Sequence, residues 1–85
     1  MTKIVNSPDK YLSLGIDAVR TGRRLEARRY FDFALKQSPN HIPTLLWLAF
    51  VAPTVQQSQA ILEQVLVLDP DNERAKAGLA WAEQQ

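Results

Sequence analysis

The chain has 85 residues, a formal net charge of +1 and no cysteine. This length corresponds to one small domain, and the lack of cysteine excludes disulfides, thiolate metal sites and a cysteine nucleophile. The longest apolar run, residues 45–52, is too short to span a bilayer, and the first residues lack the apolar stretch of a signal peptide. We therefore expect a soluble, cytoplasmic protein, with residues 1–85 as a single domain and no membrane partner.

The small net charge conceals an uneven distribution. Up to His41 the chain has eight basic and four acidic residues, a net charge of +4; after His41 it has two basic and five acidic residues, a net charge of −3. One end of the protein is therefore basic and the other acidic.

Apolar residues recur at helical spacing from the start of the chain, and no stretch alternates like a half-buried strand. Ser7 followed by Pro8 is typical of a helix N-terminus, and Gly22 is typical of a left-handed helix stop. The first predicted helix covers residues 8–21.

The next two helices are bounded by prolines. A second helix starts near Arg23 and ends before Ser38, because the residue before Pro39 is kept out of the helical region. A third covers residues 42–52 and is closed by Pro53.

The last two helices have polar residues at their predicted starts. Thr54 with Gln57 resembles a capping box for a fourth helix that continues to about Leu68. Asp71 is the expected cap of a fifth helix, which extends nearly to the C-terminus. The intervening loops are short, so successive helices should pack antiparallel.

The chain contains an internal repeat. Pro39 and Pro70 both close a predicted helix, and each is followed by Asn or Asp and then by a helix with an apolar block, at residues 48–50 and 79–81. The sequence therefore predicts a tandem of helical hairpins.

The first hairpin resembles the tetratricopeptide repeat, a unit of about 34 residues. The positions that match the family's spacing are Tyr11, Leu14, Gly15, Ala18, Gly22, Ala27, Phe31, Ala34 and Pro39. The large residue usual at the position of Ala18 is missing. The resemblance implies an all-α fold of antiparallel helical hairpins, stacked as a short right-handed superhelix. Its parts would be one repeat at 8–41, a shortened repeat at 42–72 and a capping helix at 73–85. The initial Met and the cap-like last helix favour a complete chain.

The resemblance also implies a concave groove formed by the first helix of each hairpin. The groove positions carried over to this sequence are all apolar: Leu12, Ile16, Val19, Leu46, Phe50, Ala77 and Trp81. Members that clamp a C-terminal carboxylate have Lys or Asn at the positions of Leu12, Ile16 and Leu46, so that function is not expected here. The expected ligand is an apolar or amphipathic peptide or helix of another protein.

The sequence leaves open two other interpretations of the apolar groove. It could pair with a second copy of the chain and make a homodimer. Alternatively, the C-terminal helix could fill it, with Trp81 resting on Phe50.

A group of arginines surrounds the turn between the first two helices. Its members are Arg20, Arg23, Arg24, Arg28 and Arg29. Such a cluster could bind an anionic ligand or nucleic acid. Internal pairing of Arg28 with Asp32 and of Glu26 with Arg29 is the favoured interpretation, because no aromatic residue alternates with the arginines. A nucleic-acid partner is therefore not expected.

The residues needed for catalysis are missing. His41 is the single histidine, has no nucleophile nearby in sequence and is expected to be a solvated loop residue. The acidic segment 69–73 resembles a calcium loop, but Arg74 replaces its glycine and Ala80 its bidentate glutamate. We therefore expect no enzymatic activity, no metal site and no cofactor.

Overall fold

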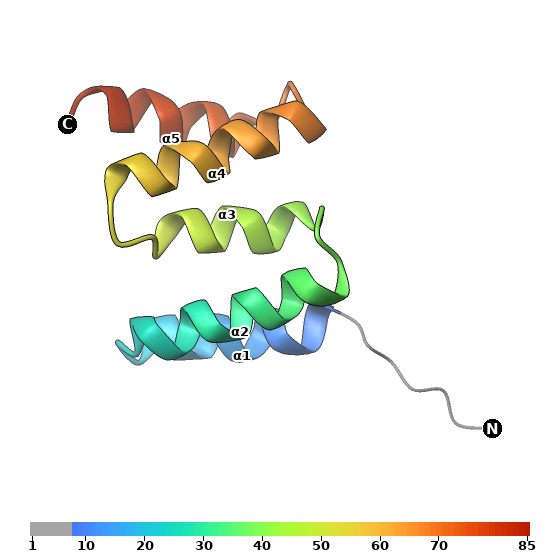
Figure 1. The fold of residues 1–85 in the computed structure, drawn as a ribbon. Coiled ribbons are helices and arrows are strands. Elements are labelled where there is room, and N and C mark those ends of the chain that lie inside the picture. The colour runs from blue at the N-terminus through green and yellow to red at the C-terminus, as the bar shows by residue number, and fades with distance from the viewer. Residues whose placement is uncertain (1–7) are drawn as a thin grey trace.

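The computed structural model describes residues 8–85, and all regular secondary structure in this range is α-helix (Figure 1). The helices are α1 (Pro8–Arg20), α2 (Arg24–Gln37), α3 (Ile42–Phe50), α4 (Val55–Leu68) and α5 (Glu73–Glu83). This confirms the all-α prediction for the described range. The expected cap at Ser7 lies outside the described residues. Within residues 8–85, no helix is both long and apolar enough to cross a membrane.

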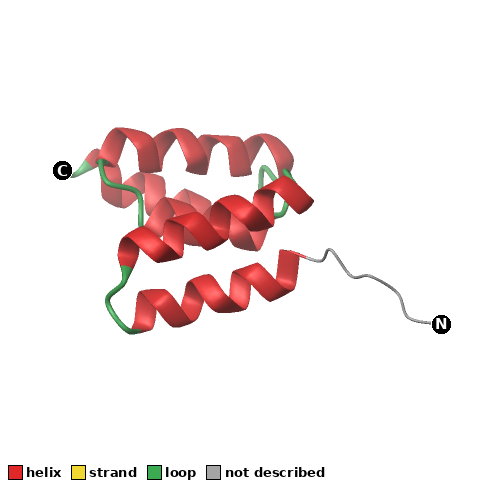
Figure 2. Ribbon diagram, turned by 60° about the horizontal axis from the view of Figure 1, so that its bottom comes forward, coloured by secondary structure: helices red, strands yellow, loops and turns green. Residues whose placement is uncertain are grey.

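The helices form two hairpins and a last helix that packs on the second hairpin (Figure 1 and Figure 2). Helix α1 packs along α2, α3 along α4, and α4 along α5, while α2 and α3 join the two hairpins. Helix α1 also touches α3, but α5 makes no comparable contact with α3. The side of α3 that faces α5 is therefore not closed by helix packing.

Two buried apolar clusters hold these layers together. The first lies between α1, α2 and α3 and is built on Ala18, Ala27, Phe31 and Val51. The second lies between α3, α4 and α5 and is built on Leu45, Ala49, Leu62, Val65 and Ala75. Helix α3 contributes to both clusters, which explains why its sequence is apolar on all sides.

The first hairpin turns at Gly22, as the sequence predicts. Gly22 has a positive φ of 79°, a conformation that residues with a Cβ seldom adopt. The N–H of Arg23 donates to the Ala18 carbonyl at 2.8 Å, and that of Gly22 to the Val19 carbonyl at 3.1 Å. These two hydrogen bonds satisfy carbonyl groups at the C-terminus of α1, in the pattern of a Schellman motif.

The polar caps of the last two helices only partly follow the prediction. The Thr54 side chain accepts a hydrogen bond from the Gln57 N–H at 3.1 Å, which confirms Thr54 as the cap of α4. The cap of α5 is Asn72 and not Asp71. The Asn72 side chain accepts from the Ala75 N–H at 2.9 Å and donates to Asp69 at 3.2 Å, so the loop geometry places the cap one residue later.

Helix α3 is shorter than expected, ending at Phe50 and not at residue 52. Ala52 precedes Pro53, and the proline ring disfavours a helical conformation at the residue before it. Val51 already departs from helical geometry, with φ −101° and ψ 9°, and is buried in the first cluster.

His41 is half-buried, so the expectation of a solvated loop residue is wrong. It occupies the position before α3, and its Nδ1 lies 2.7 Å from the hydroxyl of the fully buried Thr44. Its Nε2 lies 3.9 Å from a carboxylate oxygen of Asp9 in α1. The imidazole therefore supplies the hydrogen bond that a buried hydroxyl needs.

Candidate functional site

A groove of about 830 Å³ opens between α3 and α5, above one face of α4. Most of its lining comes from these three helices, with one residue each from α1 and α2. The lining residues are Val19, Arg24, Leu46, Trp47, Ala49, Phe50, Ser58, Leu62, Arg74, Gly78 and Trp81.

Helical spacing brings these side chains to one surface. On α3, Leu46 and Phe50 are four residues apart, and on α5 Gly78 lies four residues after Arg74 and three before Trp81. Residues three and four apart share a face of a helix. Each wall of the groove is therefore one stripe of one helix.

Gly78 sets the distance between α5 and the floor of the groove. A Cβ at this position would lie 2.8 Å from Leu62 Cδ1, which is closer than real Cβ contacts. The glycine thus lets α5 lie directly on Leu62 of α4. Because no side chain projects from residue 78, the groove stays open above it.

Aromatic rings connect the first core to the groove. The buried Phe31 ring lies 6.3 Å from the Trp47 ring, and Trp47 meets Phe50 edge-on at 5.9 Å between centroids. These are favourable separations for aromatic pairs. Phe50 therefore packs edge-on against Trp47, while the rest of its ring stays exposed.

The two outermost aromatic side chains of the groove are open to solvent. Phe50 is 64% exposed and Trp81 is 58% exposed, although both line the same groove. Trp81 therefore does not cover Phe50, and the C-terminal helix does not fill the groove.

The structure brings together four of the seven predicted groove residues, namely Val19, Leu46, Phe50 and Trp81. The other three lie elsewhere. Leu12 and Ile16 are partly buried against the first core cluster, and Ala77 is exposed on α5 outside the groove lining. On α5 the groove is lined by Arg74, Gly78 and Trp81, which share one face of the helix at spacings of four and three residues, and Ala77 does not belong to that lining.

Sequence reasoning missed the polar and floor residues of the groove. Ser58 and Leu62 belong to α4, the second helix of its hairpin, which was not expected to contribute. Arg74 could have been found, because it precedes Gly78 and Trp81 at helical spacing. Arg24 could not, because it reaches the groove through the packing of α2 on α3.

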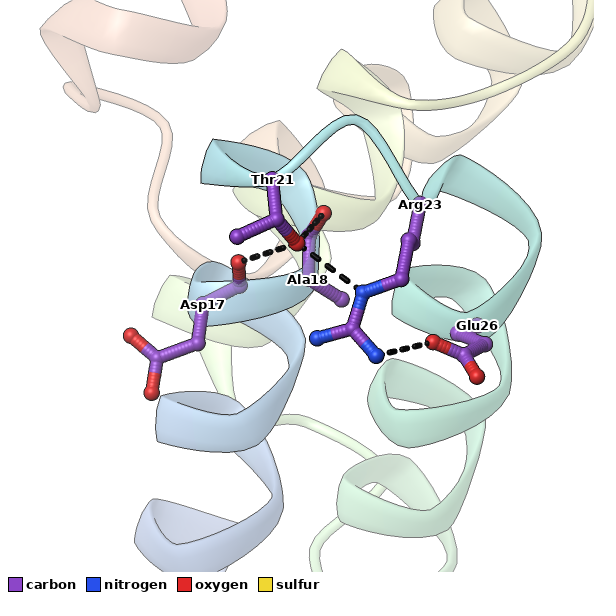
Figure 3. A network of polar contacts seen from close by, with 5 residues as sticks. All are labelled: Asp17, Ala18, Thr21, Arg23 and Glu26. Carbon is purple, nitrogen blue, oxygen red and sulfur yellow. Dashed lines mark hydrogen bonds and ion pairs between the residues drawn. The ribbon is translucent and has the colours of Figure 1, made fainter.

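One member of the arginine cluster, Arg23, is bonded into the turn between α1 and α2 (Figure 3). The Nε of Arg23 donates to the Thr21 hydroxyl at 2.9 Å, and its Nη1 lies 2.7 Å from a Glu26 carboxylate oxygen. The Thr21 hydroxyl in turn donates to the carbonyls of Asp17 and Ala18, at 3.1 and 3.2 Å. Arg23 thus stabilises this turn.

The ion pairs expected within α2 are not those observed. Glu26 pairs with Arg23, and among residues 8–85 neither Glu26 with Arg29 nor Arg28 with Asp32 forms an ion pair. Arg23 precedes the helix, where its side chain can reach back to Thr21 as well as forward to Glu26.

The other arginines of the predicted anion-binding set lie in different surroundings. Arg24 donates from Nη2 to the Phe50 carbonyl at 3.2 Å, at the C-terminus of α3, where a cation is favourable. Arg20 is exposed and Arg28 is half-buried. Of the predicted anion-binding set, Arg24 belongs to the lining of the groove, and Arg20, Arg23 and Arg28 do not.

Comparison with protein-family models and with curated proteins finds no match to this chain. The tetratricopeptide assignment stays a prediction from the residue pattern.

Proposed function

We propose that this chain is a tetratricopeptide-type module whose groove binds an apolar or amphipathic peptide or helix of another protein. The observation that carries the proposal is the exposure of Phe50 and Trp81 over one groove. Contiguous exposed apolar surface of this kind usually marks an interaction site. The stacked hairpins and the Gly22 turn support the proposed repeat type.

The energetics favour these two side chains as binding anchors. Complete burial of an apolar side chain such as Phe stabilises a complex by roughly 1.5–3 kcal/mol. Tryptophan is also over-represented among the residues that dominate binding energy.

The proposal is tested with peptides selected from a displayed library on the wild-type chain. Phe50→Glu should weaken the selected peptides by about tenfold or more, because it puts a charge on the apolar wall. Val67→Glu is the matched control, since Val67 is 81% exposed on α4 and does not line the groove. Affinities are measured by calorimetry, and folding of both variants by circular dichroism.

The proposal requires the two variants to differ. Unchanged peptide affinity in a folded Phe50→Glu variant would show that the peptide does not bind in the groove. If Val67→Glu lowered the peptide affinity equally, the loss of affinity would come from the change in net charge and not from the groove.

A homodimer through the same groove is the second candidate, because it would cover the same exposed rings of Phe50 and Trp81. It is distinguished by the molar mass in solution, measured by light scattering over a wide range of protein concentration. The peptide-binding function predicts a monomer. A dimer that Phe50→Glu converts to monomer, and that high salt weakens only in part, would establish self-association instead.

Anionic-ligand binding by the arginine cluster has less support, because Arg23 already donates to Thr21 and pairs with Glu26 of the chain itself. Failure to retain nucleic acid at low ionic strength would exclude the nucleic-acid form of that function.

A further inference from the structure

The charged residues of the groove are of one sign. Arg24 and Arg74 are the charged members of its lining, and no acidic residue belongs to the 830 Å³ groove. All other lining residues are apolar except Ser58 and Gly78. A ligand with acidic groups would therefore complement this surface.

The two arginines lie toward opposite ends of α3. Arg24 donates to the carbonyl of Phe50, the last residue of α3. Arg74 also lines a smaller adjoining groove of about 340 Å³, together with Ile42 and Pro43 at the start of α3 and with Glu73. A helix of this length spans about 13 Å, so acidic side chains about two turns apart on a ligand helix would suit cations placed toward its two ends.

Both guanidinium groups retain hydrogen-bonding capacity. A guanidinium has five N–H donors and pairs with carboxylates through two parallel bonds. Arg24 uses one donor on the Phe50 carbonyl. Arg74 is exposed and forms no hydrogen bond or ion pair with residues 8–85.

The walls of the groove favour a helical ligand over an extended one. An extended peptide needs partners for its own backbone N–H and carbonyl groups, and those left without partners in an apolar environment are costly. The lining offers few polar side chains, namely Ser58 and the two arginines. A helix satisfies its backbone internally, so it can place an apolar face against Phe50 and Trp81 without this cost.

We infer that the partner is an amphipathic helix with acidic side chains beside its apolar face, about two turns apart, which pair with Arg24 and Arg74. This inference rests on the proposed peptide-binding function of the same groove. The arginines thus select the charge of the ligand, while the aromatic side chains supply the apolar contact.

The test uses three designed helical peptides without tryptophan. They share one apolar stripe of leucines and differ at two positions beside it, two turns apart, which carry Glu, Gln or Lys. Binding is followed by protein fluorescence, because both tryptophans of the chain, Trp47 and Trp81, line the groove.

The Glu peptide should bind about tenfold more tightly than the Gln peptide, and the Lys peptide more weakly than both. This preference should decline as the ionic strength rises from about 0.05 M to about 0.5 M. Arg74→Gln should reduce the preference for Glu to about threefold, since one of two ion pairs is removed. Lys76→Gln is the matched control, because it removes the same charge from α5 outside the groove.

The possible failures are distinguishable. Equal binding of the Glu, Gln and Lys peptides, with loss of all binding in Phe50→Glu, would overturn the inference and leave the proposed function intact. An equal effect of Lys76→Gln and Arg74→Gln would also overturn it, because general charge would then explain the preference. Absence of binding by all three peptides to the folded chain would contradict both the inference and the function. A stable dimer that no peptide displaces would assign the groove to a second copy and overturn the inference.

Discussion

At Gly15, α1 lies directly against the Phe31 ring of α2. A Cβ at this position would lie 2.6 Å from Phe31 Cδ1 and 2.9 Å from Phe31 Cζ. The Phe31 ring is fully buried among Ala18, Ala27 and Val51, so it has little room to move away. The glycine therefore sets the spacing of the first hairpin.

Gly15→Ala should lower the free energy of unfolding by about 1–3 kcal/mol, because overpacking at a rigid buried ring is costly. The gain of about 1 kcal/mol in helix propensity is too small to offset a strong clash. Urea unfolding followed by circular dichroism measures the change.

Gly78→Ala is the control for this substitution. Its new Cβ would meet the end of the Leu62 side chain, a flexible group that can turn aside, so the cost should be clearly smaller. A Gly15→Ala variant as stable as the wild type would show that α1 and α2 are less closely packed than described here.

At single residues, the repeat pattern placed two exposed aromatic side chains in the groove but not all of their neighbours. Phe50 and Trp81 follow from the repeat pattern, and both line the groove. Leu12 and Ile16 do not line the groove, because the orientation of α1 about its own axis turns both side chains toward the first core cluster. Both side chains pack against the buried cluster that contains Phe31, and helical periodicity alone does not determine which face of α1 meets that cluster.

At the scale of the helices, the stability of α5 depends more than that of the others on the capping of its own N-terminus. It packs mainly on α4, since it lacks a close contact with α3. Its N-terminus is capped by Asn72, whose side chain accepts the Ala75 N–H at 2.9 Å. A helix with few tertiary contacts is sensitive to the loss of such a cap.

Asn72→Ala should destabilise α5 by about 0.5–2 kcal/mol, because the first turn loses its side-chain acceptor. Amide hydrogen exchange should then speed up in residues 73–83 more than in α1 or α2. Asp71→Ala is the matched control; its effect should be small, because Asp71 makes only a long ion pair with Lys76, 3.8 Å at an exposed position. Greater destabilisation by Asp71→Ala than by Asn72→Ala would restore Asp71 as the cap.

The helices themselves were well predicted because proline, glycine and capping residues mark their ends. Pro39, Gly22 and Thr54 each stand where a helix stops or starts. The choice between Asp71 and Asn72 could not be made from sequence, since both residue types cap helices well. The predicted ion pairs of α2 were wrong for a similar reason, because the Glu26 carboxylate could reach an arginine before it or after it in the sequence.

At the scale of the whole molecule, the groove exists because α3 and α5 do not close on each other. Its floor is Leu62 of α4, and both of its walls carry an exposed aromatic side chain, Phe50 or Trp81. The sequence predicted an apolar surface here but left open whether the last helix would cover it. The relative placement of two helices that are not adjacent in the chain depends on the packing of the helix between them, which the sequence pattern of either helix alone does not determine.

The most direct test of the groove is a nuclear magnetic resonance titration of the isotope-labelled chain with a peptide selected on it. Trp47 and Trp81 each give one indole N–H signal, and both side chains line the groove. We expect both indole signals to shift, together with backbone signals of α3 and α5, while those around Phe33 on α2 stay in place. Shifts confined to α1 and α2, with both indole signals unmoved, would contradict the account.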